Sequence, residues 1–429
     1  MIAHVAARAN ISELKAVSRM QRLGGAVIHM QPNSEVLNQV TFLTGSADIA
    51  TQLPQISAIV PFDENIISFL NDLSRVIMKD PRSRLYSDVT AFGFWIRKGS
   101  VLKMKDRFTD DGIRLGRGVA FHVAPSNVPV NFAFSLATGL LCGNANVVRV
   151  PSKEFPQVEI IIEALRSVLD IYKNMKSYVL CVRYDRNKEI NDYFSSIADI
   201  RIVWGGDRTV SELRTSSLPP RSCEITFADR YSIAVIDSDA YLAIEDKIRV
   251  AEDFYNDTYF FDQNACTSPR IIVWMGKSIS QAKEYFWKTE HELIRKRYSY
   301  QPIQGINKLE KSYLIAAVES GVRMTRQEDN LLVRVTVPQL NDRIMDYRGD
   351  SGYFYEYDCG DIIELLSICN DKRCQTVAYI GNKEMFAPLL KKGIRGVDRI
   401  VPIGKTMDFD LIWDGYDMVS QMTRRVSII

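Results

Sequence analysis

One short stretch of the chain, Phe261-Asp-Gln-Asn-Ala-Cys266-Thr-Ser-Pro-Arg270, places a cysteine among amide and small residues just before an apolar run. That run, residues 271–274, predicts a buried strand, so Cys266 is expected in a tight loop that enters the strand. A thiolate held there can attack an acyl carbon while neighbouring backbone N–H groups face the same atoms. The alternative is an inert packed thiol, since free cysteines are mostly buried.

Two loops in the first half of the chain carry polar side chains directly after apolar, strand-like runs. Asn127 lies between Pro125 and Pro129, and this restrained backbone can aim its amide N–H at a developing oxyanion. The alternative for Asn127 is an Asx turn. Ser152 and Lys153 follow the next run and precede a helical pattern, where they can contact phosphate or ribose oxygens or form a solvated N-cap.

A third loop and one carboxylate complete the set of candidate residues. Gly205 and Gly206 let the backbone approach a pyrophosphate, although a plain turn is the alternative and no GxGxxG pattern is present. Glu224 lies on an apolar, strand-like segment and is a candidate base, against the alternative of an ordinary surface glutamate. No histidine is suitably paired with Cys266, and Cys369 and Cys374 lack nearby histidines, so neither a cysteine–histidine hydrolase nor a metal site is expected.

Alternating strand and helix patterns must position these loops. The expected strands of the first half are residues 118–124, 146–150, 177–182 and 199–204, and the expected helices are residues 63–77, 132–141, 158–171 and 190–197. This alternation predicts an α/β fold with a parallel sheet covered by helices on both faces. Ligands of such sheets bind outside the carboxyl ends of the strands, where the asparagine, serine–lysine and glycine loops fall.

A second unit begins at about Ser232. Its expected strands are residues 232–236, 271–274, 331–337, 362–366 and 376–380, and its expected helices are residues 244–254 and 278–297. Before the first unit, residues 26–30 and 40–43 alternate in the manner of short strands. A length of 429 residues agrees with two or three domains rather than with one core.

Composition excludes several classes of protein. The net charge of +2, from 54 basic and 52 acidic residues, gives no basic surface for nucleic acid. No run is long and apolar enough for a membrane span, and the first residues do not form a signal peptide. Seven cysteines without regular spacing do not make a disulfide framework, so a reducing cytoplasmic location is expected, in which a reactive thiol stays available.

Taken together and in order, these loops resemble those of the aldehyde dehydrogenase superfamily. The matching segments are Pro125-Ser-Asn127-Val-Pro129, the stretch from Cys142-Gly-Asn to Pro151-Ser-Lys153, Gly205-Gly206, Glu224 and Gln263-Asn-Ala-Cys266-Thr267. Within the superfamily, the chain is most similar to LuxC-type acyl-CoA and long-chain fatty-acid reductases. That similarity rests on Phe92-Gly-Phe-Trp95, the segment from Gly116 to Asn127, Gln375-Thr-Val377, the segment from Asp398 to Gly404 and Ile412-Trp-Asp-Gly415.

The resemblance implies two Rossmann-like domains and divides the chain into three segments. It assigns residues 1–231 to an N-terminal region with the NAD(P)-binding domain and residues 232–395 to the catalytic domain that carries the cysteine. Residues 396–429 would form a segment that packs back on the cofactor domain or on a second subunit. The superfamily usually associates, so a homo-oligomer is expected.

The same resemblance implies reduction of an acyl thioester to an aldehyde. Cys266 would form an acyl-enzyme, Asn127 and the Cys266 N–H would hold the oxyanion, and Glu224 would transfer protons. Ser152, Lys153, Gly205 and Gly206 would bind the nicotinamide cofactor, with NADPH favoured over NADH because Lys153 can pair with a 2′-phosphate. The acyl donor would be acyl-CoA or an acyl-carrier thioester, with an acyl-protein synthetase as a further partner. The alternatives are an NAD(P)-dependent aldehyde dehydrogenase working oxidatively and a catalytically silent nucleotide-binding scaffold.

Overall fold

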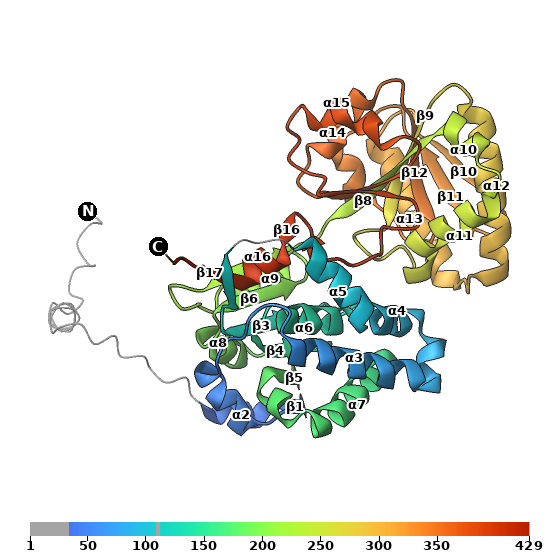
Figure 1. Ribbon diagram of the computed structural model, residues 1–429. Coiled ribbons are helices and arrows are strands. Elements are labelled where there is room, and N and C mark those ends of the chain that lie inside the picture. The colour runs from blue at the N-terminus through green and yellow to red at the C-terminus, as the bar shows by residue number, and fades with distance from the viewer. Residues whose placement is uncertain (1–33, 109–111, 429) are drawn as a thin grey trace, which may run out of the picture.

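The computed structural model describes residues 34–108 and 112–428, which form two α/β units joined by a short connection (Figure 1). The strand expected at residues 26–30 lies outside the described residues. Within the described ranges, no helix combines the length and the apolar character needed to cross a bilayer.

The first unit is built on a six-stranded sheet in the order β1-β5-β4-β3-β6-β7. Its strands are β1 (Thr41–Thr44), β3 (Val119–Val123), β4 (Ala145–Arg149), β5 (Val179–Arg183), β6 (Ile200–Trp204) and β7 (Cys223–Phe227). Neighbours from β5 to β7 run parallel, whereas β1 pairs antiparallel with β5. The predicted parallel sheet is therefore confirmed, and its carboxyl ends share one edge.

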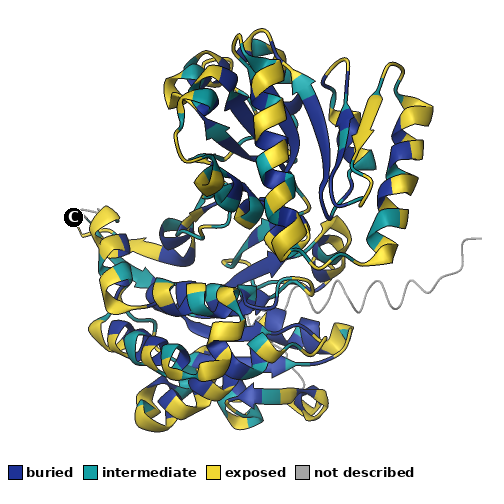
Figure 2. Cartoon of the chain, turned by 90° about the vertical axis from the view of Figure 1, so that its right-hand side faces the viewer, coloured by how far each residue is buried: buried dark blue, intermediate teal, exposed yellow. Residues whose placement is uncertain are grey.

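Helices cover both faces of this sheet, as expected. One face carries α6 (Asn131–Leu141) and α7 (Pro156–Ile171), backed by α3 (Glu64–Lys79), α4 (Ser87–Trp95) and α5 (Lys98–Arg107). The other carries α2 (Ala47–Gln52), α8 (Lys188–Ser196) and α9 (Asp207–Leu213). Both faces need a cover because the side chains of β3 alternate between them. Val119, Phe121 and Val123 pack into the core on one face, and Ala120 packs into the core on the other. Buried residues follow the strands of both units, and exposed residues lie on the outer helix faces (Figure 2).

The second unit has a seven-stranded sheet in the order β10-β11-β12-β9-β8-β13-β14. Its strands are β8 (Tyr231–Asp237), β9 (Pro269–Met275), β10 (Arg323–Arg326), β11 (Val333–Thr336), β12 (Tyr353–Asp358), β13 (Cys374–Ile380) and β14 (Arg399–Pro402). β10 is antiparallel to β11, and the other neighbours are parallel. One face packs on α10 (Ser238–Ala243), α11 (Lys247–Asp257) and α12 (Ile279–Arg297), and the other on α13 (Pro302–Val318) and α15 (Ala387–Leu390).

The strand expected at residues 362–366 is wrong, because that segment is helical. It forms the 3₁₀ turn η7 (Ile362–Leu365) and continues into α14 (Leu366–Cys369). Asp361 and Glu364 make a capping box that starts the turn, and a short apolar run cannot by itself distinguish helix from strand. The strand beside β9 is instead β12, whose tyrosine-rich sequence is typical of strands.

The chain returns to the first unit after β14. Trp413, Met418 and Met422 belong to the core of that unit, and β17 (Thr423–Val426) pairs antiparallel with β2 (Ile113–Gly116). The short hairpin of β15 (Ile412–Trp413) and β16 (Tyr416–Asp417) leads into α16 (Met418–Met422). Since β14 is still part of the second sheet, the returning segment begins after residue 402 rather than at residue 396.

Glu290 on α12 is a buried carboxyl group whose two oxygens have no hydrogen-bond partner among the described residues. Burial raises its pKa well above the ordinary value, so the folded protein holds this group protonated while the unfolded chain ionises it. Its contribution to stability is therefore complete below the ordinary glutamate pKa and decreases as the pH rises above it.

Replacing Glu290 by methionine should therefore stabilise the protein at neutral pH. We expect the free energy of unfolding at pH 7 to rise by about 1–3 kcal/mol, the cost of burying an unpaired polar group. The gain over wild type should shrink toward pH 4, as followed by denaturant unfolding at several pH values. Glu292→Met, at an exposed position on the same helix, is the control. An equal gain at both pH values would contradict the assignment.

Candidate active site

A cavity of about 630 Å³ lies between the two units, at the carboxyl ends of the first sheet. Five connections contribute most of its wall: the β3–α6 loop, the β6–α9 loop, the β7–β8 connection, the loop before β9 and residues 348–350. The returning segment adds Met407, Trp413 and Asp414. The volume is in the usual range for a small-molecule site.

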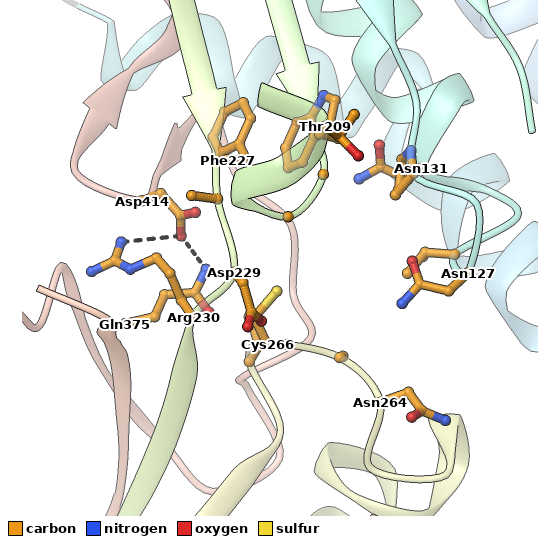
Figure 3. A pocket seen from close by; sticks show the side chains of 18 of the residues that line it. Asn127, Asn131, Thr209, Phe227, Asp229, Arg230, Asn264, Cys266, Gln375 and Asp414 are labelled. Atoms are coloured by element: carbon orange, nitrogen blue, oxygen red, sulfur yellow. Dashed lines mark hydrogen bonds and ion pairs between the residues drawn. The ribbon is translucent and has the colours of Figure 1, made fainter. Parts of the chain in front are cut away.

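Cys266 projects into this cavity from the second unit (Figure 3). It is exposed, whereas the other six cysteines of the sequence are buried or half-buried. Its carbonyl oxygen accepts a hydrogen bond of 2.7 Å from the Ser232 hydroxyl on β8, which attaches the loop to the sheet. The cysteine that opens to the cavity is thus the one that the sequence indicated.

The loop that carries Cys266 is shaped by Gln263. This residue has a positive φ of 60° and is fully buried. Its amide nitrogen donates to the carbonyls of Pro269 and Tyr353 at 3.0 Å each, and its amide oxygen accepts from the N–H groups of Gly352 and Tyr353 at 3.0 and 3.1 Å. Four hydrogen bonds therefore tie the cysteine loop to β9 and to the start of β12. Arg270, also buried, donates to the Gln263 carbonyl and fixes the other end of the loop.

The surroundings of Cys266 disfavour its thiolate. Although the thiol opens to the cavity, it lies deep between the units, and this burial is the largest cause that raises its pKa. The negative charges of Asp414 and Asp229 raise it further, while Arg270 opposes them more weakly. The thiol therefore keeps its proton at neutral pH.

Asn127 reaches the same cavity from the first unit (Figure 3). It lies in the loop between β3 and α6, and Pro125 lines the cavity beside it. The sequence interval between Asn127 and Cys266 is long, but the Asn127 loop follows the end of β3 and the Cys266 loop precedes the start of β9, and both line the cavity. The structure brings these two predicted residues to one site.

Gly205 and Gly206 also line the cavity, at the start of α9. A Cβ atom on Gly205 would lie 3.1 Å from Thr209, so the fold itself favours glycine there. A Cβ atom on Gly206 would meet no atom within 4 Å, so packing does not require a glycine at this position. The space beside Gly206 is free for a ligand to approach the backbone.

Ser152 and Lys153 are not part of the cavity wall. Both are exposed in the loop between β4 and α7, and the Lys153 ammonium lies 5.0 Å from the centre of the Phe155 ring. Because β4 is the parallel neighbour of β3, this loop emerges from the same edge of the sheet as the asparagine loop. Ser152 and Lys153 therefore lie at the same edge of the sheet as the cavity but do not line the cavity.

Glu224 is held away from the cavity by two arginines. It accepts hydrogen bonds of 2.8 and 2.5 Å from the buried Arg201 and one of 2.8 Å from Arg214. A buried guanidinium needs such a carboxylate, because an unpaired buried charge is costly. Glu224 is also near the amino end of β7, whereas the cavity lies at the carboxyl end. The structure therefore gives Glu224 a structural contact and does not bring it to Cys266.

The carboxylates that line the cavity were not among the residues that the sequence indicated. They are Asp207, Asp229, Asp350 and Asp414. Asp229 follows the end of β7 by two residues, so the strand-end rule that indicated the other loops could have found it. Asp414 arrives on the returning segment, for which the sequence offers no such signal.

Aromatic rings form a layer along one side of the cavity. Trp204 and Phe227, at the ends of β6 and β7, stack with ring centres 3.6 Å apart and planes 11° apart. Phe409 packs against both Trp204 and Trp413, at 6.2 and 4.9 Å. On its far side, Phe409 contacts Trp95 at 5.4 Å. Trp95 and Phe409 line a second, open cavity of about 750 Å³ beside α5.

Two parallel-sheet units with a cysteine and an asparagine facing a cavity between them define the aldehyde dehydrogenase fold. Solved structures agree with this fold. An oxidoreductase from Marinobacter aquaeolei superposes with a TM-score of 0.62 at 13% identity, over 88% of this chain and 89% of that one. A 1-pyrroline-5-carboxylate dehydrogenase from Thermus with bound NAD superposes with a TM-score of 0.58 at 14% identity, over 88% and 83%.

The chain belongs to the LuxC family of acyl-CoA reductases, whose profile matches residues 100–322. A long-chain acyl-protein thioester reductase from Aliivibrio fischeri is 23% identical over 293 residues, which cover 67% of this chain and 58% of that relative. The chain thus spans about three-fifths of the length of this curated relative. The resemblance found in the sequence is confirmed at the level of family and fold.

Proposed function

We propose that this protein reduces an acyl thioester to an aldehyde through an acyl group carried on Cys266. The observation that carries the proposal is the cavity in which the exposed Cys266 and Asn127 meet from opposite units. The name of the Aliivibrio fischeri relative, a thioester reductase, supports the same reaction.

Each of the two residues has a role that follows from its chemistry. The Cys266 thiolate attacks the thioester carbonyl, and the donor thiol leaves. The Asn127 amide and the Cys266 backbone N–H donate to the oxyanion that forms. The Gln263 hydrogen bonds hold the Cys266 loop in place, so the Cys266 N–H needs little rearrangement to donate.

A nicotinamide cofactor fits the edge of the cavity formed by the first unit. The open space at Gly206 lets the backbone approach a pyrophosphate, and Gly205 lies beside it. When bound, the reduced nicotinamide supplies hydride to the acyl carbon. Ser152 and Lys153, on the same edge of the sheet but outside the cavity wall, would contact the ribose, and Lys153 would favour NADPH over NADH by pairing with a 2′-phosphate.

Reduction is favoured over oxidation of an aldehyde by the position of Glu224. Its ion pairs with Arg201 and Arg214 keep it from activating a water molecule that would hydrolyse the acyl-enzyme. Purified protein should therefore consume NADPH with acyl-CoA faster than it forms NADH from aldehyde and NAD. Intact-mass measurement without cofactor should find one acyl group, located by peptide mapping on Cys266. Absence of both signals would reject the proposal.

A long apolar acyl chain suits the aromatic layer beside the cavity. Phe409 packs against Trp204, which lines the Cys266 cavity, and itself lines the second cavity with Trp95, so an acyl chain attached at Cys266 would run along this ring toward the second cavity. The second cavity is lined by apolar side chains, among them Met104, Val401 and Trp95, and by charged residues.

Filling the second cavity should change the preferred chain length. We expect Val401→Trp to lower kcat/KM for palmitoyl-CoA by at least about tenfold, the scale of a lost hydrophobic contact, while kcat/KM for hexanoyl-CoA stays near wild type. Ile303→Trp, on the exposed face of α13, is the control for an added aromatic ring. Equal losses with both thioesters would show that the second cavity does not hold the tail.

A further inference from the structure

The connection between the two units passes through the cavity and carries Asp229. This residue lies between β7 and β8, with its side chain half exposed. Asp229 is drawn beside Cys266, and its negative charge acts on the thiol (Figure 3). A carboxylate in this place can exchange a proton with sulfur atoms that react at Cys266.

Thioester exchange at Cys266 requires a proton to move twice. Burial and the neighbouring carboxylates raise the pKa of the Cys266 thiol, so a base must remove its proton before attack. The leaving alkyl thiolate must then gain a proton, because otherwise it can attack the acyl-enzyme and reverse the step. One group beside both sulfur atoms can serve for both transfers.

The other carboxylates near the thiol are less suited to this task. Asp414 is buried and is held by the Gln375 amide and, at 3.8 Å, by Arg230. Burial raises the pKa of Asp414, but these contacts fix its carboxylate on the wall behind the connection. Glu224 is bound outside the cavity by its two arginines.

Among the described residues, Asp229 pairs with Arg348, which also lines the cavity. The Arg348 guanidinium contacts one oxygen of the carboxylate and orients it. Arg270 lies in the same cluster, and the charges of Asp229, Arg348 and Asp350 all act on it. The charged groups around the thiol are thus Asp229, Asp414 and Arg270, with Arg348 behind Asp229.

We propose that Asp229 carries the proton of the Cys266 thiol to the leaving sulfur of the substrate. The S–H proton moves to an Asp229 oxygen as Sγ bonds to the acyl carbon. The bond from that carbon to the leaving sulfur then breaks, and its electron pair stays on the leaving sulfur. Asp229 gives the proton to that sulfur. Asp229 ends as a carboxylate, and no oxidant or reductant takes part. The inference rests on the proposed function and deepens it.

Asp229→Asn should slow acylation of Cys266 by about 10²-fold or more, the usual scale of acid–base catalysis. Release of coenzyme A from palmitoyl-CoA, followed without nicotinamide cofactor, isolates this step. An aryl thioester leaves as a stable thiolate that needs no proton, so it should recover the part of the rate lost with protonation of the leaving sulfur, while the part lost with removal of the thiol proton remains. Asp358→Asn removes a carboxylate of similar exposure, which pairs with Lys283 and lies outside the cavity, and should acylate like wild type.

Iodoacetamide gives a second readout that does not depend on thioester chemistry. Removing the charge of Asp229 should lower the pKa of the Cys266 thiol, so alkylation should show its midpoint at a lower pH in Asp229→Asn. Unchanged acylation by palmitoyl-CoA, no recovery with the aryl thioester or an unmoved alkylation midpoint would overturn the assignment. If wild type accepts no thioester, the proposed function fails, and the alkylation midpoint still decides whether Asp229 acts on the thiol.

Discussion

Cys266→Ser should abolish aldehyde formation while the fold and nicotinamide binding are retained. The hydroxyl of serine is a far weaker nucleophile than a thiolate, and the cavity holds no described histidine to activate it. We expect the turnover of acyl-CoA with NADPH to fall by roughly 10⁴- to 10⁶-fold, the range seen when a member of a covalent catalytic unit is removed. The acyl adduct found by intact mass should vanish with it.

A matched control separates this effect from damage to packing. Cys223→Ser makes the same change at a half-buried cysteine on β7, outside the cavity, and should leave turnover near wild type. Quenching of protein fluorescence by NADPH measures cofactor binding in each variant. Aldehyde formation by Cys266→Ser within tenfold of wild type would rule out an acyl-cysteine route.

Asn127→Ala should reduce turnover by about 10²- to 10³-fold, the effect of removing one oxyanion donor. The amide acts only when negative charge forms on the carbonyl oxygen, so kcat should fall more than KM changes. Alkylation of Cys266 by iodoacetamide forms no oxyanion and should proceed at the wild-type rate. Single-turnover acylation and the alkylation rate, measured side by side, give the comparison.

The neighbouring serine tests whether the loop itself is disturbed. Ser126 is exposed in the same loop and does not line the cavity, so Ser126→Ala should keep full turnover. Equal losses in Ser126→Ala and Asn127→Ala would indicate a displaced loop instead of a missing donor. Full turnover in Asn127→Ala would remove the amide from the mechanism.

Local patterns were sufficient for most of the first unit. The strands β3 to β6 have mostly apolar sequences, and the loops after them fall at one edge by the rules of parallel sheets. Asn127 and Gly205 could therefore be assigned to one region from sequence alone. For residues 362–366 the same patterns predicted a strand where the structure has a helical turn, because five residues are too few to reveal a helical period.

Side-chain partners that come from distant parts of the chain could not be inferred in this way. Glu224 has the sequence context of an inward-facing strand residue, but the structure pairs it with Arg201 and Arg214. Asp414 reaches the cavity because the chain returns after β14, and Phe409 enters the aromatic layer by the same route. Such contacts depend on how whole elements pack, and short-range periodicity in the sequence does not predict them.

By itself, the sequence determined the α/β class and the cysteine expected to react, because apolar periodicity and loop chemistry are local properties, and the resemblance of its loops to known motifs indicated the family. Only the tertiary structure decided which groups surround that cysteine. Folding brings Asn127, Asp229 and Asp414 to Cys266 from three separate segments and turns Glu224 toward two arginines. Burial and charge at a site are sums over neighbours in space, so the environment of Cys266 exists only in the folded chain.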